Sequence, residues 1–400
     1  MIGTQPIEFA LPKSVLRGAA QRPFGVYVHV PFCAVRCGYC DFNTYTATEL
    51  GGGGSRAEYS QNVRRELQFA ARALAERELP RRPVRTIFFG GGTPTLLPVS
   101  DLIAMKDDIA STWGLTPDVE ITTEANPDSV TAAGLGQLAA AGFTRVSFGM
   151  QSAVPAVLAT LDRTHDPARI PTVLQWAKDA GLQVSLDLIY GTPGETVSDW
   201  QTSIETALAC EVDHISAYAL VIEEGTKMAA QVRRGQLPNT DDDDLATKYE
   251  LADDAFFAAG LSWYEISNWA RAPENYCYHN VNYWRGGDWW GIGPGAHSHI
   301  GGTRWWNVKH PSTYAQRLTL GSPAAGMEIL DDDSRYLEDV LLQTRLAQGM
   351  DFADLRPASR AAVRDLVAND LVETTAAAHE RVVLTRRGRL LADSVVRALT

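Results

Sequence analysis

Three cysteines stand close together near the start of the chain, and their spacing is the strongest chemical signal in the sequence. Cys33, Cys37 and Cys40 form a C-x3-C-x2-C pattern just after the short apolar segment Val26–Val30. Three thiolates at this spacing, with no fourth cysteine nearby, fit a [4Fe–4S] cluster that keeps one iron open to a small molecule. A cluster sealed by four cysteines mainly carries electrons, so this pattern predicts redox chemistry on a bound ligand.

Other uses of these cysteines fit the sequence less well. Structural zinc normally takes four protein ligands, and the two remaining cysteines, Cys210 and Cys277, are isolated. The odd count of 5 cysteines in a chain without a secretory leader predicts a reducing, cytoplasmic location rather than a disulfide framework. On spacing alone, three unrelated buried cysteines remain an alternative.

Length and composition place the chain among globular proteins. With 400 residues, 45% hydrophobic and 21% charged, it has enough material for about two to three domains. No apolar run approaches the roughly 20 residues that cross a bilayer. The net charge of −12 argues against broad binding to nucleic acid. We therefore expect no integral membrane segment and no nucleic-acid partner.

Short apolar segments alternate with helical patterns through the first half of the chain. The expected strands are Val26–Val30, Val84–Phe89, Val119–Thr123, Arg145–Phe148, Gln183–Ile189 and His214–Ala219. The expected helices are Ala57–Glu78, Asp101–Trp113, Thr131–Ala141, Pro167–Ala180 and Thr196–Ala209. Such βα units build a parallel open sheet or a barrel, in which ligand groups gather at the carboxyl ends of the strands.

Polar motifs lie at those strand ends. The second strand runs into a glycine turn at 90–92, which lets the backbone approach a ligand and expose its N–H groups. Asp187 lies inside an apolar strand, where an unpaired charge would be costly. Each motif alone could be a turn, a cap or a buried ion pair, but together they predict one ligand shell. Its members are Gly91, Gly92, Thr93, Glu124, Gln151, Arg163 and Asp187.

Two low-complexity stretches have simpler interpretations. Gly51–Gly54 is typical of a flexible linker before a helix. Asp241–Asp244 precedes the helical pattern Leu245–Ala259, and we expect it to start that helix and to complement its dipole. Metal binding by these aspartates is disfavoured, because adjacent carboxylates on a helix do not converge on one point.

In order along the chain, these motifs resemble the radical S-adenosylmethionine superfamily, and within it the oxygen-independent coproporphyrinogen III oxidases and their relatives. The resemblance runs from about residue 22 to the C-terminus and includes Glu-Ala-Asn-Pro at 124–127 and Phe-Gly-Met-Gln-Ser at 148–152. It implies a cluster on the three cysteines whose open iron chelates S-adenosylmethionine and whose electron cleaves it to a 5′-deoxyadenosyl radical. By the same resemblance, the residues that contact S-adenosylmethionine are Tyr27, Gly91, Gly92, Thr93, Glu124, Gln151, Arg163 and Asp187.

The residue two positions beyond the cysteine pattern separates branches of this family. The oxidases that the chain resembles continue to C-x3-C-x2-C-x-C, whereas this chain has Phe42 in place of the fourth cysteine. An aromatic ring can shield a site but cannot donate a proton or a hydrogen atom as a thiol does. Oxidase activity is therefore in doubt, and the sequence leaves open whether the chain is an enzyme.

A second motif resembles the haem-binding motif of the family's haem-chaperone branch. Residues 279–284 read H-N-V-N-Y-W, an H-N-x-x-Y-W pattern that on a helix places His279 and Tyr283 on one face. Imidazole and tyrosine are both known axial ligands of haem iron. Residue types alone favour a core histidine at position 279, and only the resemblance makes His279 a haem ligand; Cys277 is another candidate thiolate ligand. Aromatic residues that could stack on a porphyrin are Tyr276, Tyr278, Trp284, Trp289 and Trp290.

These observations predict an α/β fold: a partial (β/α)6 radical S-adenosylmethionine barrel, a C-terminal α+β extension and a small winged-helix-like domain. The expected regions are an N-terminal extension (1–21), the barrel (22–235), an aromatic-rich subdomain with the haem-binding-like motif (236–325) and the C-terminal domain (326–400). In the last region we expect a hairpin of Leu371–Thr375 and Arg381–Leu384. Its arginines favour packing or partner docking over nucleic-acid binding.

The resemblance implies a cytoplasmic haem chaperone that carries a [4Fe–4S] cluster and S-adenosylmethionine. It would deliver haem to haem-requiring proteins of the respiratory chain, lie at the membrane surface during delivery, and form a homodimer in one version of the hypothesis. Two alternatives stay open. One is a radical decarboxylase acting on coproporphyrinogen, and the other is a radical enzyme that modifies RNA.

Overall fold

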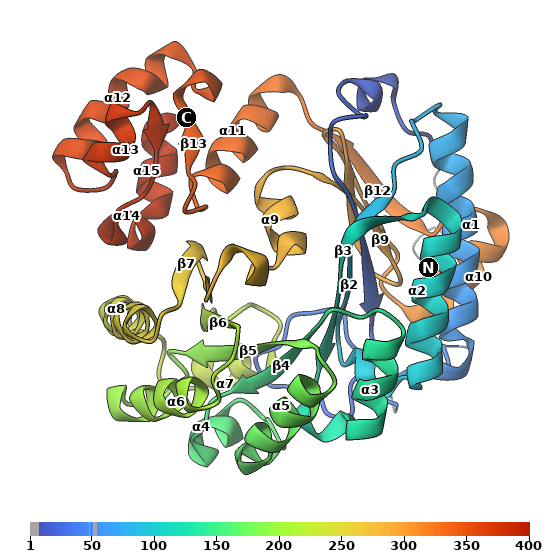
Figure 1. Ribbon diagram of the computed structural model, residues 1–400, viewed down its shortest axis with the longest axis horizontal. Helices are drawn as coiled ribbons and strands as arrows, with labels where there is room; N and C mark the ends of the chain where they lie inside the picture. The colour runs from blue at the N-terminus through green and yellow to red at the C-terminus, as the bar shows by residue number, and fades with distance from the viewer. Residues whose placement is uncertain (1–7, 48, 51–53) are drawn as a thin grey trace.

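The computed structural model describes residues 8–47, 49–50 and 54–400, and a curved open sheet dominates it (Figure 1). The sheet has 12 strands in the order β12-β11-β10-β9-β1-β2-β3-β4-β5-β6-β8-β7. Its parallel centre consists of β1 (Phe24–Val30), β2 (Val84–Gly91), β3 (Leu115–Ala125), β4 (Arg145–Gln151), β5 (Gln183–Tyr190) and β6 (His214–Ala219). These strands contain all the segments expected from the sequence, and the sheet does not close, which confirms the partial barrel.

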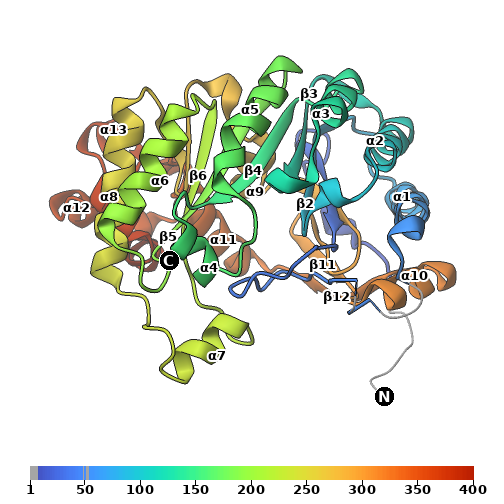
Figure 2. The ribbon, with the colours of Figure 1, turned by 90° about the horizontal axis from the view of Figure 1, so that it is seen from below.

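Helices between the strands cover the outer face of the sheet (Figure 2). They are α1 (Tyr59–Glu76), α2 (Val99–Trp113), α3 (Ala132–Ala140), α4 (Pro155–Thr160), α5 (Ile170–Asp179), α6 (Val197–Ala209) and α8 (Asp242–Ala258). The short helix α7 (Lys227–Arg233) instead projects away from the sheet (Figure 2), and the N–H of Met228 donates to the Gly38 carbonyl at 2.9 Å. The acidic run starts α8 as predicted, because the side chain of Asp241 accepts the N–H of Asp244 at 2.9 Å. The expected glycine linker lies outside the described residues except for Gly54.

Alternation along the strands separates the core from the inner face. In β1, Val26 and Val28 join the main hydrophobic core, whereas Tyr27 and His29 point the opposite way. In β5, Leu186 belongs to the same core and its neighbour Asp187 faces inward. The inner face is therefore free to carry polar side chains at the carboxyl ends of the strands.

Residues 236–325 extend both edges of this sheet. At one edge β7 (Ser262–Glu265) and β8 (Asn268–Ala270) follow β6. At the other, β9 (Asp288–Ile292) runs parallel to β1, and β10 (His297–Ile300), β11 (Thr303–Asn307) and β12 (Ala324–Ile329) continue antiparallel. Two helices, α9 (Tyr278–Trp284) and α10 (Pro311–Leu320), accompany these strands. The same segment therefore supplies strands at both ends of the barrel sheet.

Trp290 does not take the role expected for it. Its side chain is fully buried in the main core, where its ring lies 4.8 Å from that of Trp305 and 6.1 Å from that of Phe9. No porphyrin can stack on a ring that is packed on all sides. The expectation that Trp290 is one of the porphyrin-stacking residues is therefore wrong, because the alternation of β9 turns it toward the helices.

The C-terminal residues form a smaller unit with a core of its own (Figure 1). Its elements are α11 (Asp332–Gln343), β13 (Met350–Asp351), α12 (Pro357–Ala368), α13 (Thr374–Ala378), β14 (Arg381–Val382), α14 (Arg386–Leu390) and α15 (Ala392–Leu399). The expected hairpin is only partly formed. The two segments meet at a single bridge, Val372 with Leu384, while β14 pairs with β13. Three alanines after Thr375 favour the helix α13 instead.

The arginines of α14 attach this unit to the barrel. Arg389 is buried and binds the carboxylate of Asp253 in α8 at 2.7 and 3.0 Å. Arg386 binds the same carboxylate at 2.9 Å. These contacts confirm the predicted packing role.

At the other end of the chain, residues 8–21 pack on the barrel. Leu11 and Val15 belong to the main core, and Val15 lies in the short 3-10 helix η1 (Lys13–Leu16). Across the described residues, no helix combines the length and the apolar character that a membrane span requires.

Candidate functional site

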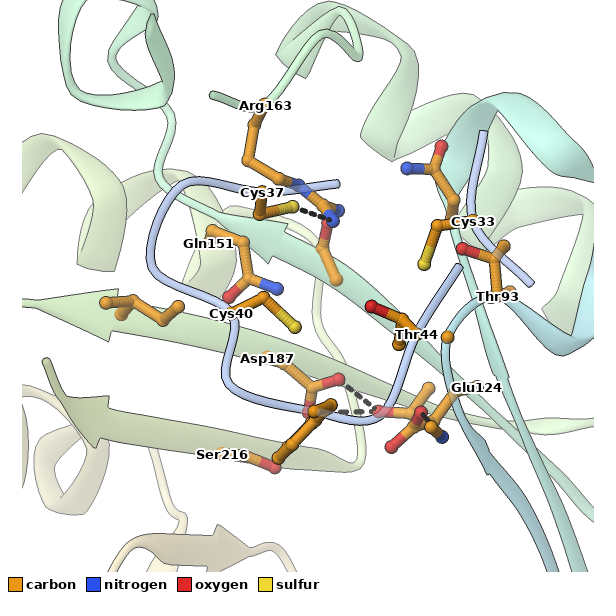
Figure 3. A pocket seen from close by; sticks show the side chains of 18 of the residues that line it. Cys33, Cys37, Cys40, Thr44, Thr93, Glu124, Gln151, Arg163, Asp187 and Ser216 are labelled. Atoms are coloured by element: carbon orange, nitrogen blue, oxygen red, sulfur yellow. Dashed lines mark hydrogen bonds between the residues drawn. The ribbon is translucent and has the colours of Figure 1, made fainter. Parts of the chain in front are cut away.

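A cavity of about 560 Å³ opens at the carboxyl ends of the parallel strands. Cys33, Cys37 and Cys40 all line it, and Figure 3 shows their sulfur atoms facing the same space as the carboxylates of Glu124 and Asp187. The structure thus brings together the cysteine pattern and the strand-end motifs, as expected from the sequence.

Backbone contacts hold the cysteine loop (residues 33–40) over this cavity. The N–H of Cys33 donates to the carbonyl of Tyr45 at 3.0 Å, and that of Gly38 donates to the carbonyl of Leu161 at 3.2 Å. A Cβ at Gly38 would lie 2.4 Å from a carboxylate oxygen of Asp162, so a larger residue here would have to displace that side chain. The loop is positioned by long-range contacts rather than by its own sequence.

Burial disfavours the thiolate form of Cys33 and Cys40, so these thiols need a nearby positive charge to ionise. Burial raises the pKa of the Cys33 thiol to about 11, and burial also raises the pKa of Cys40. The Arg163 guanidinium, 3.7 Å from the sulfur of Cys37, supplies one positive charge. Three half-buried thiols around one space fit a polynuclear iron–sulfur cluster, whose iron would hold them as thiolates.

The glycine turn joins β2 to β3 and to the segment that leads from β1 into the cysteine loop. The N–H of Gly91 donates to the Glu124 carboxylate at 3.1 Å, that of Gly92 to the carbonyl of the last residue of β1 at 2.8 Å, and that of Thr93 to the carbonyl of Phe32 at 2.7 Å. A Cβ at Gly92 would lie 2.6 Å from the Phe32 carbonyl oxygen. The expectation that the turn exposes its N–H groups is therefore wrong, because all three are used within the protein.

Two half-buried carboxylates face the cavity. Burial, together with the negative charge of Asp187, raises the pKa of Glu124 to about 8. Burial raises the pKa of Asp187 to about 6, although Ser147 donates to that carboxylate at 3.0 and 3.1 Å. Carboxylates in such a position are suited to accept hydrogen bonds from ligand hydroxyl groups.

Some buried polar atoms at the cavity have no partner among the described residues. They include Oε1 of Gln151, Nε of Arg163 and Oγ1 of Thr122. Gln151 also adopts a left-handed backbone conformation, with φ of +62°, which non-glycine residues rarely adopt. Unpaired buried polar groups and backbone strain at one cavity point to a polar ligand that this site binds.

Several other cavity residues were not predicted from the sequence. They are polar side chains at alternate positions of β4, β5 and β6: Arg145, Ser147, Ser185, His214 and Ser216. Polar residues at every second position of otherwise apolar strands indicate a polar inner face, because only one face of each strand joins the core.

Tyr27, His279 and Tyr283 lie beside the cavity rather than in its wall. His279 is only 1% exposed, and its two ring nitrogens bind Thr86 Oγ1 and the Tyr283 hydroxyl, each at 2.8 Å. The Tyr27 hydroxyl binds His29 Nδ1 at 3.0 Å. His279 and Tyr283 do share one helix face as predicted, but in this structure that face is turned inward and His279 has no free ring nitrogen.

The start of α9 is anchored from β3. The Glu120 carboxylate accepts the N–H of Tyr278 at 2.8 Å and that of His279 at 3.0 Å. Cys277 lies just before α9 and reaches the cavity wall, and burial raises the pKa of its thiol. The buried carboxylate therefore holds the motif in place from a strand far away in the sequence.

An open parallel sheet with three cysteines and a glycine turn at its carboxyl edge defines a radical S-adenosylmethionine protein. In agreement, residues 27–207 match the Radical SAM superfamily. The coproporphyrinogen III oxidase (HemN) from Escherichia coli has a similar fold, with a TM-score of 0.80 and 22% sequence identity over 99% of this chain and 95% of that one.

Full-length relatives narrow the class further. The chain is 51% identical to the haem chaperone HemW of Mycobacterium tuberculosis (strain H37Rv) over 380 residues, which are 94% of this chain and 95% of that protein. It is 32% identical to HemW of Bacillus subtilis (strain 168) over 92% of this chain and 97% of that protein. The chain therefore belongs to the HemW family of haem chaperones within the radical S-adenosylmethionine superfamily.

Proposed function

We propose that this protein is a haem chaperone that binds haem, a [4Fe–4S] cluster and S-adenosylmethionine and passes the haem to haem-requiring proteins. The observation that carries the proposal is the 51% identity to a haem chaperone across nearly the whole of both chains. The cavity supports it with a complete set of cysteine and polar side chains.

The cysteine loop is the proposed cluster site. Cys33, Cys37 and Cys40 would hold the cluster; the loop has no fourth cysteine, and Cys277, which reaches the cavity wall, is distant from them in sequence. A cluster held by three cysteines supplies one open iron to chelate a ligand and a source of single electrons. The Arg163 guanidinium beside Cys37 would offset part of the negative charge of the three thiolates.

The strand-end shell is the proposed S-adenosylmethionine site. Arg163 would meet the carboxylate of the methionyl group, and Glu124 and Asp187 would accept hydrogen bonds from the ribose hydroxyls. The methionyl amine donates hydrogen bonds, so it would pair with the carbonyl oxygens of Gly91 and Gly92. The N–H groups of the turn donate within the protein. Gln151 would use its unpaired Oε1, while Tyr27 supports the shell from beside the cavity.

The aromatic ring of Phe42 favours binding and transfer of a porphyrin over a radical reaction on that porphyrin. Its ring is 56% exposed and lines the cavity where the oxidases that the chain resembles have a fourth cysteine. A phenyl ring offers apolar surface to a flat tetrapyrrole and no group that could donate a proton or a hydrogen atom. The alternative decarboxylase function lacks this thiol.

The choice of acceptors follows from the same proposal. We expect haem to pass to respiratory haem proteins, with the chaperone in the cytoplasm and at the membrane surface during transfer. A homodimer is part of this hypothesis.

The decisive experiment is an anaerobic titration of haem into the cluster-reconstituted protein, followed by transfer to an apo-acceptor such as apomyoglobin. The proposal expects a saturable haem spectrum and transfer at a rate above that of free haem exchange. Absence of binding would overturn it. Formation of protoporphyrinogen from coproporphyrinogen, with S-adenosylmethionine and a reductant present, would instead establish the decarboxylase.

A further inference from the structure

The hydrogen bonds of the histidines limit which of them can bind iron. All 8 histidines lie in the described part of the chain, and a haem ligand needs a ring nitrogen with a free lone pair that can reach the surface. Both ring nitrogens are already hydrogen-bonded in His29, His214, His279 and His299. His165 has unpaired nitrogens but is only 4% exposed.

Three histidines then remain, and their surroundings separate them. His310 caps α10 and binds Ser312 through Nδ1. His379 lies on the C-terminal unit, bonded to the carbonyl of Thr375, and no aromatic ring contacts it among the described residues. His297, the first residue of β10, is exposed, and within the described chain no hydrogen bond engages either ring nitrogen. Among the described residues His310 keeps Nε2 free and meets the Tyr45 ring edge-on at 5.4 Å, whereas the exposed His297 stacks on an indole ring of the sheet.

That aromatic surface is built into the sheet. His297 pairs with Trp306 across β10 and β11, and the two rings are stacked with centroids 5.8 Å apart and planes at 24°. Trp306 lies flat over Gly326 of β12, where a Cβ would come within 2.3 Å of the indole. The neighbouring Trp305 points to the opposite side, into the main core. Trp306 therefore presents its side chain on the inner face.

Trp289 connects this surface to the H-N-x-x-Y-W motif. Its indole N–H donates to the carbonyl of His297 at 2.9 Å, and its ring lies 4.5 Å from that of Tyr283. Tyr283 is in turn bonded to His279. The buried H-N-x-x-Y-W motif thus supports Trp289, which holds the backbone of His297. His279 itself has no free ring nitrogen.

The charges around His297 suit haem. Partial burial and the positive charges of Lys309 and Arg304 lower the pKa of His297, which keeps the imidazole neutral and able to bind metal. Arg304 is paired with Glu328, whereas no ion pair engages Lys309 within the described ranges. An unpaired ammonium close to the ligand is suited to a haem propionate.

This surface also adjoins the cysteine loop. The Asn43 side chain donates to the carbonyls of Pro294 and Lys309, at 2.9 and 2.8 Å, just before β10 and just after β11. Asn43 follows the exposed Phe42 of the cavity wall. A porphyrin at His297 would therefore lie near the mouth of the proposed cofactor cavity.

We propose that His297 is the axial ligand of the haem iron, on a surface formed with Trp289 and Trp306, and that His279 and Tyr283 are positioning residues behind it. This inference rests on the proposed haem-chaperone function. It commits to an iron porphyrin with a propionate near Lys309.

The test is a haemin titration into the full-length reconstituted protein, read by absorption and resonance Raman spectroscopy. His297→Ala should lower haem affinity about tenfold or more and remove the signature of histidine ligation. His297→Tyr should instead produce tyrosinate–iron bands, and added imidazole should restore histidine-type ligation in His297→Gly. His379→Ala, an exposed histidine elsewhere, should behave like the wild type.

A more conservative variant tests the positioning role of His279 if His279→Ala fails to fold. His279→Gln can keep one hydrogen bond, and it should retain histidine-ligated haem with at most weaker affinity. Loss of histidine ligation in folded His279→Gln, or unchanged haem spectra and affinity in His297→Ala, would overturn the inference while leaving the chaperone proposal intact. Failure of the wild type to bind haem would overturn the chaperone proposal itself.

Discussion

His279 and Tyr283 hydrogen-bond to each other at 2.8 Å across one turn of α9, on a face turned toward β2. The His279 ring also stacks on Phe88 with centroids 5.2 Å apart. Burial lowers the pKa of His279 to about 3, so the imidazole stays neutral at physiological pH. The pair thus couples α9 to the barrel sheet and, through Trp289, to the exposed His297.

His279→Ala should destabilise the protein. The substitution leaves Thr86 Oγ1 and the Tyr283 hydroxyl unpaired and opens a buried cavity, so we expect the free energy of unfolding to fall by about 2–4 kcal/mol. Urea unfolding followed by tryptophan fluorescence measures it. The control is His379→Ala, an exposed position where about 0.5 kcal/mol or less is expected. Equal midpoints for the two variants would contradict the structural role.

Each cysteine of the loop should be needed for the cluster. Cys40→Ala should abolish the broad visible absorption of a reconstituted [4Fe–4S] protein, because two thiolates do not hold the cluster against loss of iron. Iron and sulfide analysis together with absorption provides the measurement. Cys210→Ala, a half-buried cysteine outside the cavity, is the matched control and should keep full iron content. Retention of the cluster in Cys40→Ala would refute the proposed ligand set.

Gly92→Ala should displace the cysteine loop from β2. Its Cβ would meet the Phe32 carbonyl at 2.6 Å and the Val30 carbonyl at 2.9 Å, a clash with backbone that we expect to cost about 1–3 kcal/mol. Reconstituted iron content and S-adenosylmethionine affinity should both fall. Gly136→Ala serves as the control, since a Cβ there meets open space in α3 and adds up to about 1 kcal/mol of helix stability. Normal cofactor loading in Gly92→Ala would show that the turn tolerates a side chain.

Glu124 should make the cofactor-free protein less stable as the pH rises. Its pKa is raised in the folded state, from 4.5 to about 8, so the folded protein holds a proton that the unfolded chain releases. The stability associated with that proton is fully present below about pH 4.5 and is lost as the pH rises toward about 8.

Glu124→Gln isolates this contribution, because glutamine resembles the protonated acid and does not titrate. Melting temperatures measured from pH 4.5 to 9 should be similar for the two proteins at the acid end, with the variant more stable above pH 8. A constant difference across the range would mean that Glu124 does not titrate there.

Much of the barrel could be predicted from the sequence, because the relevant signals are local. Strand segments such as Val84–Phe89 have a clear apolar pattern, and the parallel arrangement follows from their alternation with helices. The cysteine spacing and the polar residues at strand ends predicted one shared cavity, since carboxyl ends of parallel strands meet at one edge.

Contacts between segments that are distant in sequence determined how the H-N-x-x-Y-W motif and the tryptophans are oriented. Glu120 and His279 are 159 positions apart, yet their contact turns the H-N-x-x-Y-W motif inward. Trp290 and Trp305 entered the core while Trp289 and Trp306 reached the inner face, because strand register determines which side of a sheet each residue occupies. The sequence by itself predicted the class of cofactor through residue types and spacing. Only the tertiary structure decided which histidine is buried and which is open, because burial and hydrogen bonding depend on the whole fold.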